Sequence, residues 1–223
     1  MNRLENRYSV RQRLGVAVTV AALLWFWMFS PWTGYLTNFW ITMTAAGLSL
    51  TTLALSFSAE LRNDVRQFFH RHTVGWMVRQ LLLGMAIAAF MWGVFWAGDK
   101  LSSLLFDFAR PQVDTIYGMK HGLPTTVIAI LLLFIIGPAE ELFWRGYVQR
   151  TIATHVDANV GLALTLIIYA LVHIWSFNFM LVMAALVAGF VWGLLYRLRP
   201  DWLPVLIISH AVWDACVFVV FPI

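Results

Sequence analysis

The chain has 223 residues, of which 61% are hydrophobic and 12% are charged, and its mean hydropathy is +0.77. These values exclude an ordinary soluble domain and indicate a polytopic membrane protein. The net charge of +4 does not indicate a nucleic-acid-binding protein, because the basic residues are dispersed and form no patch interleaved with aromatic residues. We therefore expect membrane lipids, through their anionic headgroups, as partners and no nucleic acid.

Seven apolar runs have about the length of a membrane-spanning helix, which is roughly 20 residues. They cover about residues 14–36, 38–57, 75–97, 123–150, 160–177, 180–196 and 203–221. The chain is therefore predicted to be an all-α, polytopic transmembrane helix bundle of about seven spans. We also expect an amphipathic surface helix between Ser58 and Thr73, and a loop from Gly98 to Gly122 that caps the outer face.

Arginines are concentrated before the first run and after the second, fourth and sixth runs. Because cytoplasmic loops carry the excess of lysine and arginine, we expect a multi-pass protein of the cell inner membrane with a cytoplasmic N-terminus and an outer C-terminus. An arginine-rich start ahead of an apolar run also resembles a signal peptide. No small-residue cleavage site follows Phe29, so we expect a retained first helix. The four N-terminal arginines are Arg3, Arg7, Arg11 and Arg13, and the opposite loops carry Lys100, Arg110 and Lys120.

Two adjacent glutamates lie in the fourth run. Neighbouring side chains on a helix point about 100° apart, so Glu140 and Glu141 need different partners. Arg145 follows Glu141 at i+4, a spacing that favours an ion pair. Glu140 has no cation on its own helix and is therefore the candidate general base. Gly137-Pro138, just before it, removes a helix hydrogen bond and predicts a kink.

Ionisable residues also interrupt the fifth and seventh runs. His173 lies in an apolar stretch, where a lone histidine is more often structural than catalytic, and His210 and Asp214 share one helix face at i and i+4. That spacing suits orientation of the imidazole by the carboxylate. Charge at bilayer depth indicates function. A rise of about 1.5 Å per residue places these groups and Glu140 at similar depths, so we expect one cavity between the fourth, fifth and seventh helices, opening to the cytoplasm.

A carboxylate base, two imidazoles and a carboxyl group around one wet cavity suit hydrolysis of a carbonyl compound. The three motifs together resemble the CPBP family of CAAX proteases and bacteriocin-processing enzymes, which includes the Ras-converting CAAX endopeptidase. The resemblance covers about residues 123–221 and predicts a CPBP-like catalytic core over 123–223. Residues 1–122 form the expected N-terminal membrane region, whose helices match no family. The motifs are Glu140-Glu141-x-x-x-Arg145, Tyr169-x-x-x-His173 and His210-x-x-x-Asp214.

The resemblance implies a glutamic intramembrane endopeptidase acting on a peptide or protein substrate near the cytoplasmic side. It implies that Glu140 activates water with the assistance of His173, and that His210 and Asp214 shape the oxyanion site. Glu141 and Arg145 would support them. Asp214 stands where the CAAX endopeptidase has Asn, and it would have to be neutral or share a proton in order to donate to an oxyanion.

Three alternatives stay open at this point. Glu140, His173 and His210 would also make a His₂Glu zinc set, although the resemblance ranks a mechanism without cofactor first. A peptide-binding bacteriocin-immunity or assembly factor without activity is disfavoured because all catalytic residue types are intact. A proton-coupled transporter, which also uses buried carboxylates and histidines, is disfavoured because the chain lacks repeated, interrupted helices.

Overall fold

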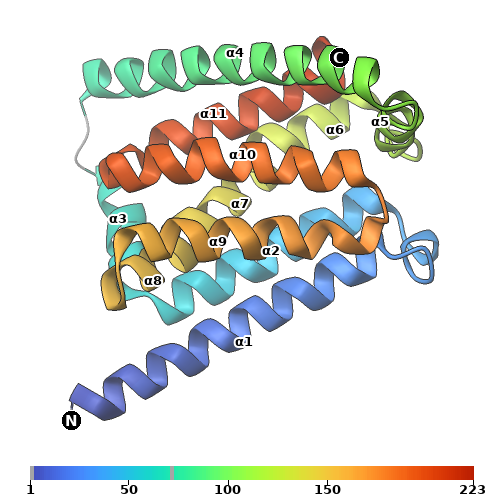
Figure 1. The fold of residues 1–223 in the computed structure, drawn as a ribbon. Coiled ribbons are helices and arrows are strands. Elements are labelled where there is room, and N and C mark those ends of the chain that lie inside the picture. Colours follow the sequence, from blue (N-terminus) through green and yellow to red (C-terminus); the bar gives the residue numbers. More distant parts are fainter. Residues whose placement is uncertain (1–2, 71–72) are drawn as a thin grey trace.

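The computed structural model describes residues 3–70 and 73–223 as a bundle of long helices, with the two termini at opposite ends (Figure 1). Within these ranges there is no strand, and seven helical segments are long and apolar enough to cross a membrane. The predicted all-α polytopic bundle is confirmed. The seven segments are Ser9–Phe29, Phe39–Phe57, Val74–Leu105, Thr125–His155, Ala158–Ser176, Phe179–Leu198 and Pro200–Val220.

The first two helices form a pair that packs against the rest of the bundle. Helix α1 (Arg3–Phe29) ends earlier than predicted, because Pro31 lacks the N–H that a continuing helix needs. Helix α2 (Phe39–Phe57) begins at Asn38, whose side chain accepts hydrogen bonds from two backbone N–H groups of the first turn. Helix α3 (Ala59–His70) confirms most of the predicted surface helix, and residues 71–72 of that prediction lie outside the described residues.

The predicted loop over residues 98–122 is wrong. Helix α4 (Val74–Leu105) continues beyond the expected end at residue 97, and helix α5 (Ala109–Gly118) occupies much of the remainder. The reason is the environment of Asp99, whose side chain is buried with its carboxylate 3.3 Å from Lys100 Nζ and 3.6 Å from Arg110 Nη1. Because this charge is compensated, it does not end the helix.

The fourth span is one helical path from Thr125 to His155 that is interrupted twice. Helices α6 (Thr125–Leu131), α7 (Gly137–Phe143) and α8 (Arg150–His155) are joined by π-helical turns over Leu132–Ile136 and Trp144–Gln149. The first turn ends just before Gly137-Pro138, so the predicted interruption takes the form of a π turn. Such turns occur frequently at functional sites. Here they flank the paired glutamates.

Of the last three spans, the first two begin at residues whose side chains accept backbone N–H groups, Asp157 and Asn178. They are α9 (Ala158–Val172), extended by a 3₁₀ turn over His173–Ser176, α10 (Phe179–Leu198) and α11 (Leu203–Ala215), which a π turn over Cys216–Val220 prolongs. Backbone N–H groups of Asn159 and Val160 donate to the Asp157 carboxylate at the start of α9 and hold its pKa below the usual range. Helix α11 packs against α4 and α7, and α9 packs against α10.

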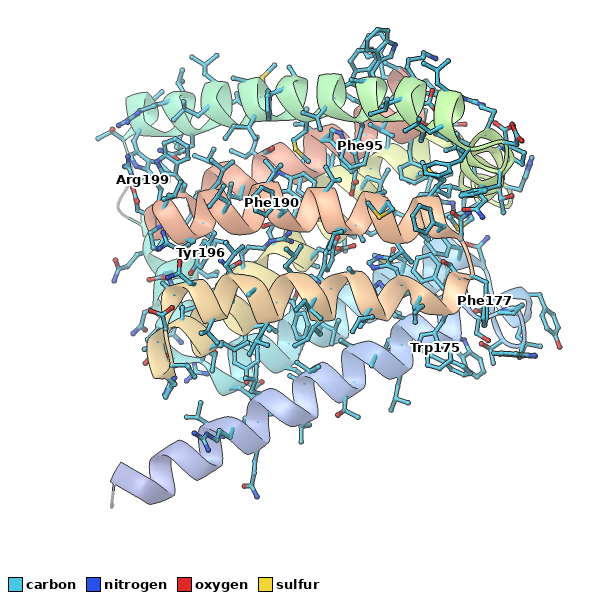
Figure 2. The ribbon with its side chains drawn as sticks, in the orientation of Figure 1. Phe95, Trp175, Phe177, Phe190, Tyr196 and Arg199 are labelled. Carbon is cyan, nitrogen blue, oxygen red and sulfur yellow. The ribbon has the colours of Figure 1, made fainter. Side chains whose placement is uncertain are left out.

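The bundle has two chemically different ends. One, which we name the arginine end, holds the start of α1, helix α3 and the α8–α9 connection, at the left of Figure 1. The other, the α5 end, holds α5 and the α1–α2 and α9–α10 connections. Figure 2 labels Tyr196 and Arg199 near the arginine end, and Trp175 and Phe177 at the α5 end. The arginines with described side chains at the arginine end are Arg11, Arg13, Arg62, Arg66, Arg79, Arg150, Arg197 and Arg199.

Candidate active site

The predicted catalytic side chains converge on one cavity of about 580 Å³. Glu140 on α7, His173 at the end of α9, and His210 and Asp214 on α11 all line it, and each is at most 7% exposed. The expected cavity between the fourth, fifth and seventh spans is therefore present. Helices α1, α2, α4, α5 and α10 contribute further walls.

Glu140 is held by a tyrosine from the neighbouring helix. The Tyr169 hydroxyl donates to Glu140 Oε2 at 2.8 Å. Tyr169 reaches this position beside Gly189 of α10, where an added Cβ would lie 3.0 Å from Tyr169 Cδ1. The bond fixes one carboxylate oxygen. Among the described residues the other oxygen, Oε1, has no hydrogen-bond partner and can take a water molecule from the cavity.

Glu141 joins two helices through one oxygen atom. Its Oε1 accepts from Arg145 Nη1 at 2.9 Å and from His210 Nδ1 at 2.7 Å. Both the glutamate and the arginine are essentially inaccessible, at 0% and 1% exposure. The predicted pair of Glu141 with Arg145 is confirmed. The second bond shows that this carboxylate also orients the imidazole of His210.

Orientation of His210 by Asp214, expected from their spacing, is not what the structure shows. Asp214 Oδ2 lies 3.6 Å from His210 Nε2, which is too far for a hydrogen bond. The imidazole is oriented instead by Glu141 of α7, which accepts a hydrogen bond from His210 Nδ1. The His210 ring instead stacks on Trp192, with ring centroids 3.9 Å apart and an interplanar angle of 21°. The Arg145 guanidinium also lies over this indole, with its carbon 5.6 Å from the ring centroid.

A glycine lets α7 approach α11 closely enough for these contacts. A Cβ on Gly137 would lie 2.7 Å from Ala211 Cα and 2.9 Å from Ala211 N, which is shorter than non-bonded atoms tolerate. Only the absence of a side chain at this position allows the two backbones to meet. One helical turn further along, Glu141 can then reach His210.

Both ring nitrogens of His173 are occupied. Nδ1–H donates to the Tyr169 carbonyl oxygen at 2.7 Å, and Nε2 accepts from Trp25 Nε1 at 3.1 Å. These two bonds fix the tautomer and the ring orientation. Trp25 is fully buried on α1, outside all three motifs. Neither ring nitrogen of His173 is free in this arrangement, whereas the resemblance implied that His173 assists Glu140 in activating water.

The zinc alternative would need Glu140, His173 and His210 to form one ligand group. Across residues 3–70 and 73–223, no three histidine, cysteine or acidic side chains come together as a group that could hold a metal ion. In this set both ring nitrogens of His173 take part in hydrogen bonds, to the Tyr169 carbonyl and to the Trp25 indole.

The cavity extends from Glu140 toward the α5 end of the bundle. Beyond Glu140 on the arginine side, large side chains that are at most 3% exposed fill the interior: Phe143, Trp144, Arg145, Tyr147 and Gln149. Toward the α5 end the cavity lining includes several small residues among its aromatic ones: Gly98, Ser102, Ala184, Ala185 and Ala188. A second cavity, of about 650 Å³, lies at the arginine end and touches none of the four predicted catalytic residues.

Comparison with protein families agrees with this geometry. Residues 122–216 match the family described as Rce1-like, type II CAAX prenyl endopeptidase, a CPBP family. This segment belongs to the Rce1-like family. Neither a curated protein nor a solved structure matches the chain. The Rce1-like segment contains all three motifs, so the family inferred from them is confirmed, and it indicates CAAX-type intramembrane protease activity.

Three residues of the site were not assigned from the sequence. Tyr169 belongs to a motif of the Rce1-like segment, and its i, i+4 spacing to His173 was the available signal. Trp192 was expected mainly to pack, yet it stacks on His210. No sequence feature identifies Trp25 as a site residue, since it is one of twelve tryptophans and lies outside the Rce1-like segment.

Replacing Trp25 by Phe should lower kcat/KM by roughly tenfold, because it leaves the buried Nε2 of His173 without its donor, a loss of about 1–3 kcal/mol. Phe keeps most of the ring volume. The matched control is Trp27→Phe on the same helix, where the side chain is 40% exposed, and it should keep wild-type kinetics. Equal kinetics of the two variants would show that the hydrogen bond does not position His173.

Proposed function

We propose that the protein is a glutamic intramembrane endopeptidase that hydrolyses a peptide bond with water activated at Glu140. The observation that carries this proposal is the setting of Glu140. Its carboxylate lines a largely apolar cavity beside His173, His210 and Asp214, with one oxygen fixed by Tyr169 and the other available to water. A positioned carboxylate in such surroundings can act as a general base.

In the proposed reaction Glu140 takes a proton from water as the water oxygen bonds to the substrate carbonyl carbon. The carbonyl electrons move to oxygen, and the resulting oxyanion accepts hydrogen bonds from Nε2–H of a doubly protonated His210, whose Nδ1–H stays bonded to Glu141, and from a protonated Asp214. Glu140 then returns the proton to the leaving nitrogen as the C–N bond breaks. The hydrogen bond to Glu141 fixes His210 during both steps.

His173 has a positioning role in this proposal. Its bond to the Tyr169 carbonyl fixes the last turn of α9, from which the Tyr169 hydroxyl reaches Glu140. Trp25 holds the other ring nitrogen from α1. The partners in this proposal are a peptide or protein substrate and the lipids of a cell membrane, with no nucleic acid.

Hydrolysis is tested with purified protein in detergent micelles. The protein is incubated with a solubilised membrane extract of the expression host, and new peptide termini are identified by mass spectrometry. We expect termini that are absent when the enzyme carries Glu140→Gln. A folded wild-type protein that generates no new termini would contradict the assignment.

Prolonged chelation should leave the activity intact, and elemental analysis of active enzyme should find far less than one metal ion per chain. The reason is that Glu140 and its hydrogen-bond partners supply the base, so no metal is needed to lower the pKa of water. Inactivation by a chelator that added zinc reverses would instead make Glu140 a ligand and overturn the mechanism.

A further inference from the structure

The cavity leads from Glu140 to one end of the bundle only. Its outer walls come from the helix termini at the α5 end. They include the last residue of α1, the first residue of α2, the residue that follows α4, and the first residue of α10: Phe29, Phe39, Phe106 and Phe179. Phe95 of α4, labelled in Figure 2, forms a deeper wall, with its ring centroid 4.5 Å from that of Trp213. A substrate therefore reaches Glu140 from the α5 end.

Helix α5 lies over this mouth and is tied to α10. Val113, Ile116 and Tyr117 of α5 line the cavity. The Gln112 side chain accepts from Met180 N at 3.0 Å, and its backbone carbonyl accepts from Asn178 Nδ2 at 2.8 Å. Helix α5 also packs against α4. It therefore forms a roof that joins the two helices between which the cavity lies.

The walls select apolar side chains. Outside the four ionisable groups at its base, the cavity is lined almost entirely by aromatic, aliphatic and methionine side chains, with Asp99, Ser102 and Tyr117 as polar exceptions near the mouth. Asp99 is already paired with Lys100 and Arg110. The volume of about 580 Å³ falls in the range of roughly 300–1,000 Å³ typical of ligand sites. It suits a short apolar stretch of peptide.

The charge distribution decides which side of the membrane this mouth faces. Eight arginines with described side chains lie at the arginine end, whereas the α5 end carries three basic residues, Lys100, Arg110 and Lys120. Lysine and arginine in short loops accumulate on the cytoplasmic side. The arginine end therefore faces the cytoplasm and the α5 end faces outward.

We infer that this protein takes an apolar segment of an exported peptide or membrane protein from the outer side of the membrane, entering beneath α5, and not a cytoplasmic tail. The inference rests on the proposed hydrolysis at Glu140 for its chemistry. The route of entry rests on the position of the cavity mouth and on the distribution of arginines between the two ends of the bundle.

Cysteine labelling in intact cells tests the route. In a Cys216→Ser background, which removes the one native cysteine, single cysteines replace Thr115 on the exposed face of α5, Ala184 in the cavity wall and Asn63 on the exposed face of α3. A small, membrane-impermeant thiol reagent should react with the first two in intact cells and with the third only after permeabilisation. Reaction of the α3 cysteine alone in intact cells would reverse the orientation. Reaction at Thr115 but not Ala184 would show that the cavity is closed to that side.

Activity gives a second arm that separates access from chemistry. A bulky thiol reagent on Ala184→Cys should lower proteolysis at least tenfold, while the same reagent on Thr115→Cys, outside the cavity, should leave it unchanged. In cells, the cleavage sites lost in the Glu140→Gln variant should map to outer segments of membrane or exported proteins. Sites in cytoplasmic tails would overturn the inference. Labelling needs no catalysis, so an inactive wild-type protein would contradict hydrolysis and leave the access result standing.

Discussion

Glu140→Gln should abolish proteolysis, with a loss of at least about 10²-fold, the effect typical of removing a general base. The amide has nearly the same volume and can still accept the hydrogen bond that the Tyr169 hydroxyl donates at 2.8 Å. It cannot take a proton from water. The measurement is the rate at which purified enzyme in detergent generates the peptide termini found with wild-type protein.

Two variants sharpen this test. Tyr169→Phe removes the donor to Glu140 Oε2 and keeps the ring, so it should lower the rate about tenfold, less than loss of the base itself. Thermal unfolding of Glu140→Gln should match the wild type, which shows that the loss is chemical. A Glu140→Gln enzyme with wild-type rates would remove Glu140 from the mechanism.

Breaking the buried pair of Glu141 and Arg145 should be strongly destabilising. Removing one partner leaves the other charge buried without compensation, which costs about 3–5 kcal/mol. For a chain of this length that corresponds to a fall in the unfolding midpoint on the order of 10 °C. Activity should fall as well, because Glu141 also holds His210 at 2.7 Å. The variants are Glu141→Gln and Arg145→Ala, measured by thermal unfolding and by proteolysis.

The double variant and a surface control complete this experiment. If the two residues act as a pair, Glu141→Gln with Arg145→Ala should be little worse than either change alone. Arg150→Ala is the control, because Arg150 pairs with Asp64 at 2.7 Å on a partly exposed surface, where such pairs contribute at most about 1 kcal/mol. Additive losses at residues 141 and 145 would mean that their contact contributes nothing.

The spans and the choice of site residues could be predicted because both depend on local sequence. A run of apolar residues is a sufficient signal for a spanning helix, and an ionisable residue within such a run is conspicuous. The ion pair of Glu141 with Arg145 followed from helical spacing alone. Where a charge is compensated from another helix, the same reasoning fails. The loop predicted from Gly98 includes Asp99, which lies within α4 and has Arg110 of α5 beside it.

The hydrogen-bond pattern of the site could not be predicted, because it depends on how the helices pack. Spacing brought Asp214 near His210, yet the bond goes to Glu141 because Gly137 lets α7 approach α11. Counting residues gave the depth of Glu140 in the membrane but not the side from which it is reached. The side from which Glu140 is reached depends on how side chains from several helices fill the space around it. The sequence of one helix does not contain this information.

The hydrogen bond from Trp25 to His173 has a consequence for how this protein can be divided and recombined. The family match begins at residue 122, so a fragment or a chimera built on it would keep every motif and lose the indole N–H that holds His173. It would also lose the walls that α1, α2, α4 and α5 provide. The first helix therefore contributes to the candidate site, and we expect a graft of residues 122–216 onto foreign membrane helices to hold His173 only if the new first helix supplies an equivalent donor.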